Sequence, residues 1–424
     1  MKKEVIKEYL LFYGKVPKNT LILYLANITT SLLSLFFFGI LARYLGVFNF
    51  GVFSYVYAFM TTAQTIGAFG LDMFMIRELS TENQNVMDNI GNILVLKILS
   101  SLITLIFTLI TVSFLNLEPL TKKILLLFSP YIIFSNLNLT LWYIGDGYQK
   151  MEYRSSFTII YYCFRTIFGW IIAKYTQDIT ILFIFLLIIE FFFSIISFWT
   201  ANLYFGRIKL TIKKNIFKKI CCCSFPFAVS SILYIFLLRM DILLLNTLKG
   251  EKAVGLYSPA QKLVNLLFLL SISFISAIYP AMAKASRTTG NKDYYFFTFS
   301  IRIVSLAGIL MAVFTTILAG PVIKIIFGSE YAVSVEILKI LVWMIPPFFC
   351  ASLLWVLFAV KNFQHWTTII YLIGFPVNFV LNFCLAKKMT YFGSALAMVI
   401  FSVFISIISF IIYYGNRKKL FNMQ

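Results

Sequence analysis

The chain has 424 residues, of which 61% are hydrophobic and only 12% are charged, and its mean hydropathy is +0.90. A soluble domain carries about a quarter charged residues, so this composition excludes a soluble globular protein and predicts an integral membrane protein. The net charge of +20 does not indicate nucleic-acid binding. Most Lys and Arg residues lie in short connections between apolar runs, where positive charge sets membrane orientation and contacts anionic lipids.

Twelve apolar runs are long enough to cross a bilayer, which takes about 20 residues for each crossing. They are continuous and do not alternate in polarity, so they predict α-helices and exclude barrel strands. The expected spans are residues 19–42, 50–71, 88–115, 124–145, 155–174, 179–205, 217–247, 254–281, 297–319, 333–360, 365–386 and 391–415. The connections between them are too short to fold into a domain outside the membrane.

The most cationic stretch is the loop 206–219, which reads GRIKLTIKKNIFKK and separates the sixth expected span from the seventh. Positive residues beside spans are retained on the cytoplasmic side. With this loop inside, the cytoplasmic segments hold about twice as many Lys and Arg residues as the opposite loops. Both termini are therefore expected in the cytoplasm, and the loop divides the chain into two six-span lobes, 1–210 and 211–424.

A short pattern recurs after the first span of each half. Gly46–Ser54 reads GVFNFGVFS and Gly250–Ser258 reads GEKAVGLYS, so both have glycines five apart, then an aliphatic residue, an aromatic residue and serine, at an offset of 204. The recurrence predicts a parallel internal duplication. Repeats of this kind enclose a substrate site near mid-membrane and work by alternating access. The expected fold is all-α, with twelve transmembrane helices in two six-helix bundles around a central cavity.

Several short motifs follow one another in a characteristic order along the chain. They are Arg43-Tyr44-Leu45-Gly46, Phe50-Gly51-Val52-Phe53, Gly70-Leu71 with Arg77-Glu78-Leu79-Ser80, Arg239-Met240-Asp241-Ile242-Leu243, residues 254–262 (VGLYSPAQK), Tyr279-Pro280, Gly320-Pro321-Val322-Ile323 and Phe327-Gly328-Ser329-Glu330-Tyr331. Because these motifs occur in this order, the chain resembles the Wzx-type polysaccharide flippases of the multidrug/oligosaccharidyl-lipid/polysaccharide superfamily. The resemblance extends over nearly the whole chain.

The resemblance implies a transporter that moves oligosaccharide repeat units of O-antigen, a part of lipopolysaccharide, or of capsule. The implied substrate is linked to undecaprenyl diphosphate and crosses the bacterial inner membrane, with an ion gradient as the expected driving force. The expected partners are this lipid-linked oligosaccharide, membrane lipids, a glycan polymerase and a chain-length regulator. No cofactor is implied.

Ionisable side chains inside spans are costly, and they usually face a cavity or one another. Seven ionisable residues of the expected spans are the candidates: Lys97, Arg165, Glu190, Arg239, Asp241, Lys262 and Arg302. Five are cations, and Lys and Arg bind phosphate oxygens. We therefore expect Lys97, Arg165, Arg239, Lys262 and Arg302 to line a cationic cavity for the diphosphate. Arg302 has an alternative as a side chain that extends to the membrane surface from near a helix end.

Glu190 and Asp241 are the candidates for ion coupling, because a buried carboxyl group can bind a proton or a cation. Each has a structural alternative, in which Glu190 pairs with Arg165 and Asp241 pairs with Lys262. Pro226, early in the seventh span, is expected to bend that helix.

Catalysis is not expected from this sequence. The single histidine, His365, lies at a helix start without a Ser or Cys motif nearby, and no glycine-rich phosphate loop precedes a helix. The six cysteines show neither metal-ligand nor disulfide spacing, so no metal site is expected. A membrane glycan polymerase or acyltransferase is therefore a weak alternative. A drug or small-cation antiporter of the same superfamily is a closer one, but its cavity is expected to be acidic.

Overall fold

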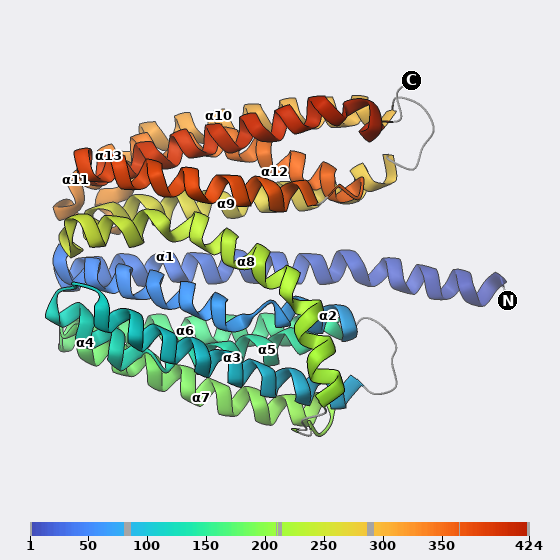
Figure 1. The fold of residues 1–424 in the computed structure, drawn as a ribbon, viewed down its shortest axis with the longest axis horizontal. Coiled ribbons are helices and arrows are strands. Elements are labelled where there is room, and N and C mark those ends of the chain that lie inside the picture. Colours follow the sequence, from blue (N-terminus) through green and yellow to red (C-terminus); the bar gives the residue numbers. More distant parts are fainter. Residues whose placement is uncertain are drawn as a thin grey trace. The chain divides into compact units, whose positions relative to one another are not determined.

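The computed structural model describes residues 2–79, 86–208, 210, 214–285, 292–363 and 365–421, and almost all of them are helical (Figure 1). The helices are α1 (Lys2–Ala68), α2 (Leu71–Leu79), α3 (Val86–Phe114), α4 (Pro119–Phe128), α5 (Tyr131–Gly147), α6 (Met151–Tyr175), α7 (Ile179–Phe205), α8 (Lys214–Lys249), α9 (Glu251–Ala285), α10 (Lys292–Ile326), α11 (Ala332–Leu341), α12 (Ile345–Val360) and α13 (His365–Phe421). Two single turns of 3-10 helix lie at Ser329–Tyr331 and Val342–Met344. Ser80 and part of the basic loop 206–219, residues 209 and 211–213, lie outside the described residues.

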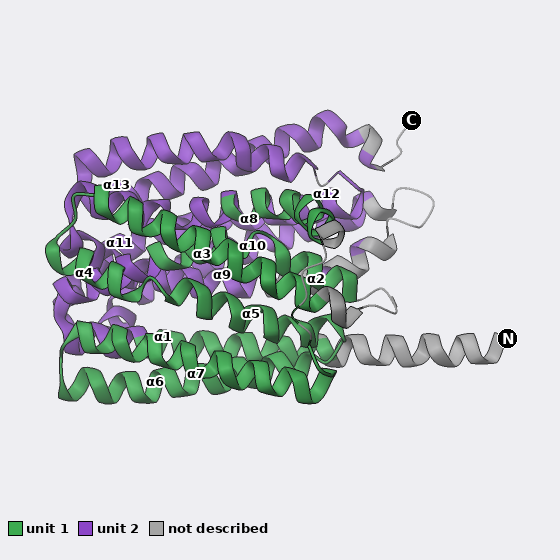
Figure 2. Ribbon diagram, turned by 60° about the horizontal axis from the view of Figure 1, so that its bottom comes forward, with its two compact units in different colours: residues 1–37, 59–232 green, residues 38–58, 233–424 purple. Residues whose placement is uncertain are grey.

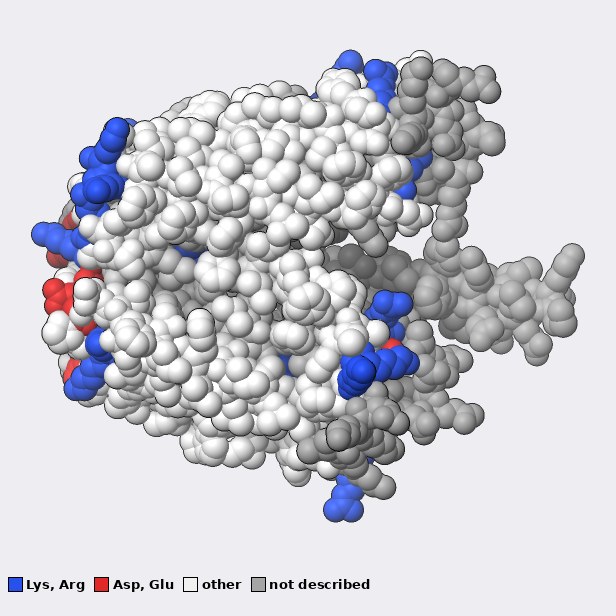
Figure 3. Space-filling view, viewed as in Figure 1, with Lys and Arg blue, Asp and Glu red and all other residues white. Residues whose placement is uncertain are grey.

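The helices expose many large apolar side chains and bury several polar ones. In α3, the side chains of Lys97, Ser101 and Thr108 are buried, whereas Ile103 and Ile106 are exposed. A helix of a soluble protein has the opposite arrangement. Figure 3 shows Lys and Arg side chains near the ends of the helices, with an almost uncharged band between them. The exposed apolar surface therefore faces lipid.

Nine helices of the described part are long and apolar enough to cross a membrane. The number is ten if α4 and α5, which meet at 43°, form one broken span. The break falls at Ser129 and Pro130. The sequence predicted one uninterrupted span here, over 124–145.

Two of these helices, α1 and α13, double back on themselves. The backbone leaves the helical conformation at Gly46 in α1 and at Met389 and Thr390 in α13. The rings of Phe38 and Phe53 have their centroids 5.3 Å apart. A straight helix would separate these two residues by about 22 Å. Likewise, Asn382 Nδ2 lies 3.9 Å from Met398 Sδ. Both reversals fall in gaps between expected spans.

The chain forms two compact units (Figure 2). Unit 1 comprises Met1–Phe37 and Phe59–Ile232, and unit 2 comprises Phe38–Ala58 and Leu233–Gln424. The reversal of α1 thus belongs to unit 2, and α8 continues from unit 1 into unit 2. These boundaries differ from the lobes 1–210 and 211–424, which stay a prediction.

The two recurring glycine motifs pack against each other in unit 2. A Cβ atom added to Gly51 would lie 1.8 Å from the carbonyl oxygen of Glu251, and one added to Gly255 would lie 2.0 Å from that of Val47. The offset of 204 relates Gly51 to Gly255 and Val47 to Glu251. Each glycine therefore approaches the carbonyl group of the equivalent residue in the other motif. Only glycine permits this approach of the two backbones.

Two other motifs of the resemblance also meet in unit 2, at the end of α10. The guanidinium group of Arg43 donates hydrogen bonds to the carbonyl oxygens of Ile325 and of Ile326, the latter at 3.1 Å. The hydroxyl of Tyr331 donates to the carbonyl oxygen of Ala42 at 3.0 Å. The last carbonyls of a helix lack partners within it, so Arg43 caps α10.

A tryptophan–serine hydrogen bond recurs in the two halves of the sequence. Trp142 of α5 donates to Ser197 of α7 at 2.8 Å, and Trp355 of α12 donates to Ser409 of α13 at 3.2 Å. The tryptophan helices each follow a helix of 10 residues, α4 and α11. Equivalent contacts between corresponding helices are what a duplicated unit produces.

We expect Trp142→Phe and Trp355→Phe each to lower the free energy of unfolding by about 1 kcal/mol, because a serine hydroxyl among the helices loses its hydrogen-bond donor. Thermal unfolding of the purified protein in detergent measures the effect. Trp199→Phe on the exposed face of α7 is the control and should not change the melting temperature. Equal shifts in all three variants would show that the hydrogen bonds do not stabilise the fold.

Candidate functional site

The chain breaks sharply between α1 and α2. Phe69 and Gly70 both have positive φ, 49° and 65°, and α2 begins at the next residue. A Cβ atom at Gly70 would lie 2.5 Å from the backbone nitrogen of Ala228 and 2.7 Å from the carbonyl oxygen of Ser224. Glycine at this position therefore lets the break contact the backbone of α8 directly, on either side of Pro226.

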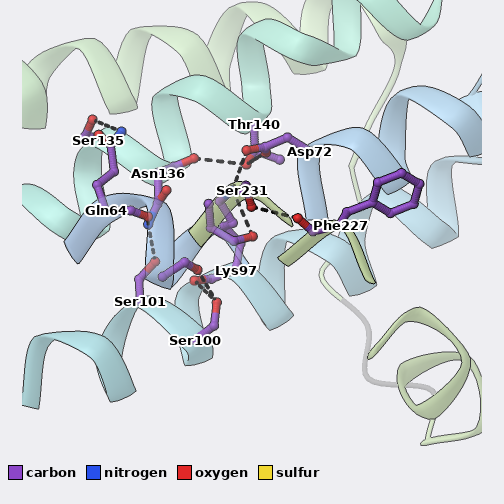
Figure 4. Close-up of polar contacts among 12 residues, drawn as sticks. Gln64, Asp72, Lys97, Ser100, Ser101, Ser135, Asn136, Thr140, Phe227 and Ser231 are labelled. Carbon is purple, nitrogen blue, oxygen red and sulfur yellow. Dashed lines mark hydrogen bonds and ion pairs between the residues drawn. The ribbon is translucent and has the colours of Figure 1, made fainter. Parts of the chain in front are cut away.

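The break places Asp72, in the first turn of α2, beside Lys97 of α3 (Figure 4). Lys97 Nζ lies 2.7 Å from Asp72 Oδ2 and 3.5 Å from the carbonyl oxygen of Ala68. Thr140 of α5 donates to Asp72 Oδ1 at 2.8 Å. The side chain of Lys97 is 0% exposed and that of Asp72 is 15% exposed. In this structure the predicted phosphate ligand Lys97 is thus held by a carboxylate.

Polar contacts continue from Thr140 along α5. Asn136 donates through Nδ2 to Ser101 Oγ at 2.9 Å and to the carbonyl oxygen of Gln64 at 3.2 Å. Gln64 in turn donates to Ser135 Oγ at 2.6 Å. Figure 4 shows these side chains grouped with the Lys97–Asp72 pair. We call the set Gln64, Asp72, Lys97, Ser101, Ser135, Asn136 and Thr140 the unit 1 network.

A second buried group surrounds Glu190 of α7. Tyr161 OH donates to Glu190 Oε1 at 2.5 Å, and Asn138 Nδ2 donates to Glu190 Oε2 at 2.7 Å. The guanidinium carbon of Arg165 lies 4.5 Å from the ring centroid of Phe37, and its charge also acts on Glu190. Arg165 thus acts electrostatically on Glu190, which also accepts hydrogen bonds from two donors that the sequence did not indicate.

Helix α5 contributes to both groups through two stripes of residues. Asn136 and Thr140, four positions apart, contact the unit 1 network. Asn138 and Trp142, also four apart, contact Glu190 and Ser197 of α7. Residues four apart lie on one face of a helix, so α5 stands between the carboxylates of Asp72 and Glu190.

In unit 2, Asp241 of α8 is tied to α9. Tyr257 OH and Gln261 Nε2 each donate to Asp241 Oδ2 at 2.7 Å. Lys262 Nζ lies over the ring of Phe38, 4.0 Å from its centroid. Arg239 is half-buried and acts electrostatically on Asp241. The carboxylate of Asp241 and the ammonium of Lys262 therefore have different neighbours.

The remaining candidate, Arg302, lies in α10 of unit 2. It is exposed and has the exposed Phe299 and Leu306 three positions before and four positions after it. Residues at this spacing share one face of a helix, so Arg302 lies on the lipid-facing surface. No group of three His, Cys, Asp or Glu residues close enough to hold a metal ion occurs in the described part of the chain.

The sequence did not indicate Asp72 as a site residue. It lies one residue beyond the expected span 50–71. The feature that could have identified Asp72 is its position two residues after Gly70. It lies at the start of a short helix whose apolar residues Leu71, Phe74 and Met75 are buried.

Comparison with known proteins identifies relatives over most of the chain. The model of the family described as polysaccharide biosynthesis protein matches residues 16–286, and the MatE model matches residues 226–384. The capsular polysaccharide biosynthesis protein CapF of Staphylococcus aureus is 27% identical over 336 residues, which are 76% of this chain and 80% of CapF.

Two solved structures show the fold. The lipid II flippase MurJ, in an inward closed conformation, has a TM-score of 0.76 at 17% identity, covering 94% of this chain and 89% of MurJ. A multidrug resistance MATE family transporter of the MOP superfamily, in an inward-facing conformation, has a TM-score of 0.67 at 13% identity, covering 94% and 96%. The chain is a multi-pass membrane protein with this fold.

Proposed function

Because the chain belongs to the polysaccharide biosynthesis protein family, we propose that it flips oligosaccharide repeat units linked to undecaprenyl diphosphate across the bacterial inner membrane. The family match over residues 16–286 is the observation that carries this proposal. The similarity to CapF supports a glycan destined for the cell surface. Transport proceeds by alternating access and draws on an ion gradient.

The proposed topology has twelve spans and two bundles. The reversals at Gly46 and at Met389–Thr390 divide α1 and α13 into two spans each, and α4 with α5 forms one. Twelve crossings leave both termini on one side, which the basic loop 206–219 assigns to the cytoplasm. The symmetric glycine contact and the recurring tryptophan–serine hydrogen bonds support two duplicated bundles.

In this proposal, the cationic side chains of the protein bind the diphosphate of the substrate. Arg239 and Lys262 are both partly accessible and lie in unit 2, so we assign them the direct contacts. Arg165 and Lys97 are buried beside carboxylates, and each reaches a ligand only after a conformational change. Arg302, on the lipid-facing surface, contacts the headgroup region. Glu190 and Asp241, each held by a tyrosine hydroxyl and a side-chain amide, are the proposed coupling carboxylates.

The test is flipping of a fluorescent lipid-linked oligosaccharide in proteoliposomes. Arg239→Ala and Lys262→Ala should each slow flipping about tenfold or more, because a hydrogen bond to a charged group contributes about 1.5–3 kcal/mol. Lys339→Ala is the control, since Lys339 is exposed and pairs with Glu336. Unaltered flipping by both variants would exclude them from the phosphate site.

The second candidate is a drug or small-cation antiporter, which the MatE match over residues 226–384 favours. The same proteoliposomes distinguish the two. Efflux of a cationic dye with no flipping of the lipid-linked oligosaccharide would establish the antiporter and overturn the flippase.

A further inference from the structure

A second ion pair of unit 1 lies at the turn between α5 and α6. Asp146, near the end of α5, pairs with Arg154 of α6, whose guanidinium group also lies over the ring of Tyr143. We propose that Asp146 and Arg154 bind hydroxyl groups of the sugar on the lipid-linked substrate, with the rings of Tyr143 and Tyr148 beside it. This rests on the proposed function, and it assigns recognition of the glycan to residues other than the proposed phosphate ligands.

The turn itself holds the two side chains in place. The backbone nitrogen of Lys150 donates to the carbonyl oxygen of Gly145 at 2.8 Å, and Gln149 has a positive φ of 57°, which is typical of tight turns. The first residues of α6 are therefore brought back against the last turn of α5. In this arrangement Arg154 Nη1 lies 2.5 Å from Asp146 Oδ2.

Arg154 is fixed on one edge and on one face of its guanidinium group, and it keeps donors for a ligand. Among the described residues the guanidinium group donates to Asp146 alone, through Nη1. Its central carbon lies 4.5 Å from the ring centroid of Tyr143. A guanidinium group has five N–H donors, and the side chain of Arg154 is 25% exposed, so a ligand can reach the remaining donors.

Asp146 has an acceptor atom that the described residues do not use. Its side chain is 8% exposed, and Oδ1 is buried without a hydrogen-bond donor among the described residues. A buried acceptor without a donor is unfavourable, so this position favours a ligand that supplies an O–H group. A sugar hydroxyl accepts one hydrogen bond and donates another, which matches the donors of Arg154 and the acceptor of Asp146. Arg154 is the more exposed partner, so the hydroxyl contacts it first and reaches Oδ1 as the Arg154 side chain shifts.

The charges around the pair favour a hydroxyl group over a phosphate. Arg154 also acts electrostatically on Asp72, whose own partner is Lys97. Two carboxylates therefore balance two cations here. The exposed Lys150 and Glu152 of the turn balance each other as well. A diphosphate gains little net attraction from such a site, whereas a neutral hydroxyl group does not need any.

Aromatic rings lie beside the ion pair. Tyr143 and Tyr148 are half-buried, and both pack against the buried cluster that contains Leu71 and Phe74. Tyr148 also stacks on Phe205, with ring centroids 5.1 Å apart. One part of each ring is thus covered by the protein and another part stays accessible. The C–H groups of a sugar ring form an apolar face that an aromatic ring can cover.

The proposed topology puts the turn between α5 and α6 on the cytoplasmic side, the side of both termini. The proposed function moves the substrate outward from this side. The subsite therefore lies where the glycan is first bound.

Binding of two lipids to the purified protein in detergent tests the proposal. The probes are the lipid-linked oligosaccharide isolated from the bacterium that makes this protein, and undecaprenyl diphosphate without sugar. We expect the wild type to bind the first about tenfold or more tightly than the second, because only the first supplies hydroxyl groups to Asp146 and Arg154. Asp146→Asn/Arg154→Gln removes both charges and leaves no unpaired ion. This variant should bind the two lipids equally, with the wild-type affinity for undecaprenyl diphosphate.

Arg154→Lys separates recognition from structure. Lysine keeps the charge and can keep the ion pair with Asp146, but it lacks the planar fork of the guanidinium group. The preference for the glycosylated lipid should fall severalfold, whereas the melting temperature should stay that of the wild type. The matched control is Glu336→Gln/Lys339→Gln, which removes an exposed ion pair from α11 and should keep the full preference.

The outcomes distinguish this proposal from the proposed function. Equal binding of the two lipids by the wild type, or a preference that stays unchanged in Asp146→Asn/Arg154→Gln or in Arg154→Lys, overturns the sugar subsite and leaves the proposed function in place. If the wild type binds neither lipid, the proposed function fails and the subsite fails with it.

Discussion

Gly51→Ala and Gly255→Ala are each expected to destabilise the protein by about 3 kcal/mol or more, because a new Cβ atom overlaps a backbone oxygen. The overlaps are at 1.8 Å with Glu251 and at 2.0 Å with Val47, and neither oxygen belongs to a side chain that can rotate away. The two helix hairpins must separate to accept the methyl group. Thermal unfolding and the yield of monodisperse protein in detergent measure the loss.

Gly320→Ala is the matched control for these variants. Gly320 also lies in a helix of unit 2, α10, but nothing lies within 4 Å of a Cβ atom added there. Alanine favours a helix over glycine, so this variant should be as stable as the wild type or slightly more stable. The symmetric contact also predicts similar losses in the first two variants. Stability like that of Gly320→Ala in both would show that the hairpins do not pack as described.

Asp72→Asn is expected to cost about 3–5 kcal/mol of folding free energy, because it leaves the buried ammonium of Lys97 without a counter-charge. Adding Lys97→Met should restore most of the loss, since an apolar side chain of similar length then fills the site. The free energy of unfolding, measured by denaturant titration in detergent, reports both effects.

The exposed ion pair of Glu336 and Lys339 provides the control for this prediction. Glu336→Gln removes a carboxylate from an ion pair of the same length, 2.7 Å, whose side chains are 40% and 58% exposed. Exposed pairs contribute about 0–1 kcal/mol, so this variant should unfold close to the wild type. If Asp72→Asn proves equally mild, the carboxylate does not neutralise Lys97.

The nine helices of the described part that are long and apolar enough to cross a membrane were predictable, because each contains a continuous apolar run that is visible in the local sequence. The reversals at Gly46 and at Met389–Thr390 accordingly fall in predicted gaps. Helix α2 was not predicted, because its nine residues are too short and too polar for a span. The break within 124–145 was also missed, since Pro130 lies inside an apolar run whose hydropathy does not change there.

The side chains of the candidate site were predictable only in part. Lys97, Arg165 and Glu190 are identified by their charge within apolar runs. Their partners are not, because pairing depends on how helices distant in sequence pack. Asn138 meets Glu190 across 52 positions, and polar uncharged residues such as Asn138 and Thr140 do not stand out in hydropathy. Asp72 lies one residue beyond the expected span 50–71 and was not among the predicted site residues.

The reciprocal contact of Gly51 and Gly255 bears on how such a protein arises. In a dimer of a six-helix ancestor, one glycine per subunit would meet its own copy across a two-fold axis, and the contact would be made twice. Fusion of two gene copies would preserve that interface and would leave each side free to diverge. The self-association surface of the ancestor would thus survive inside a single polypeptide.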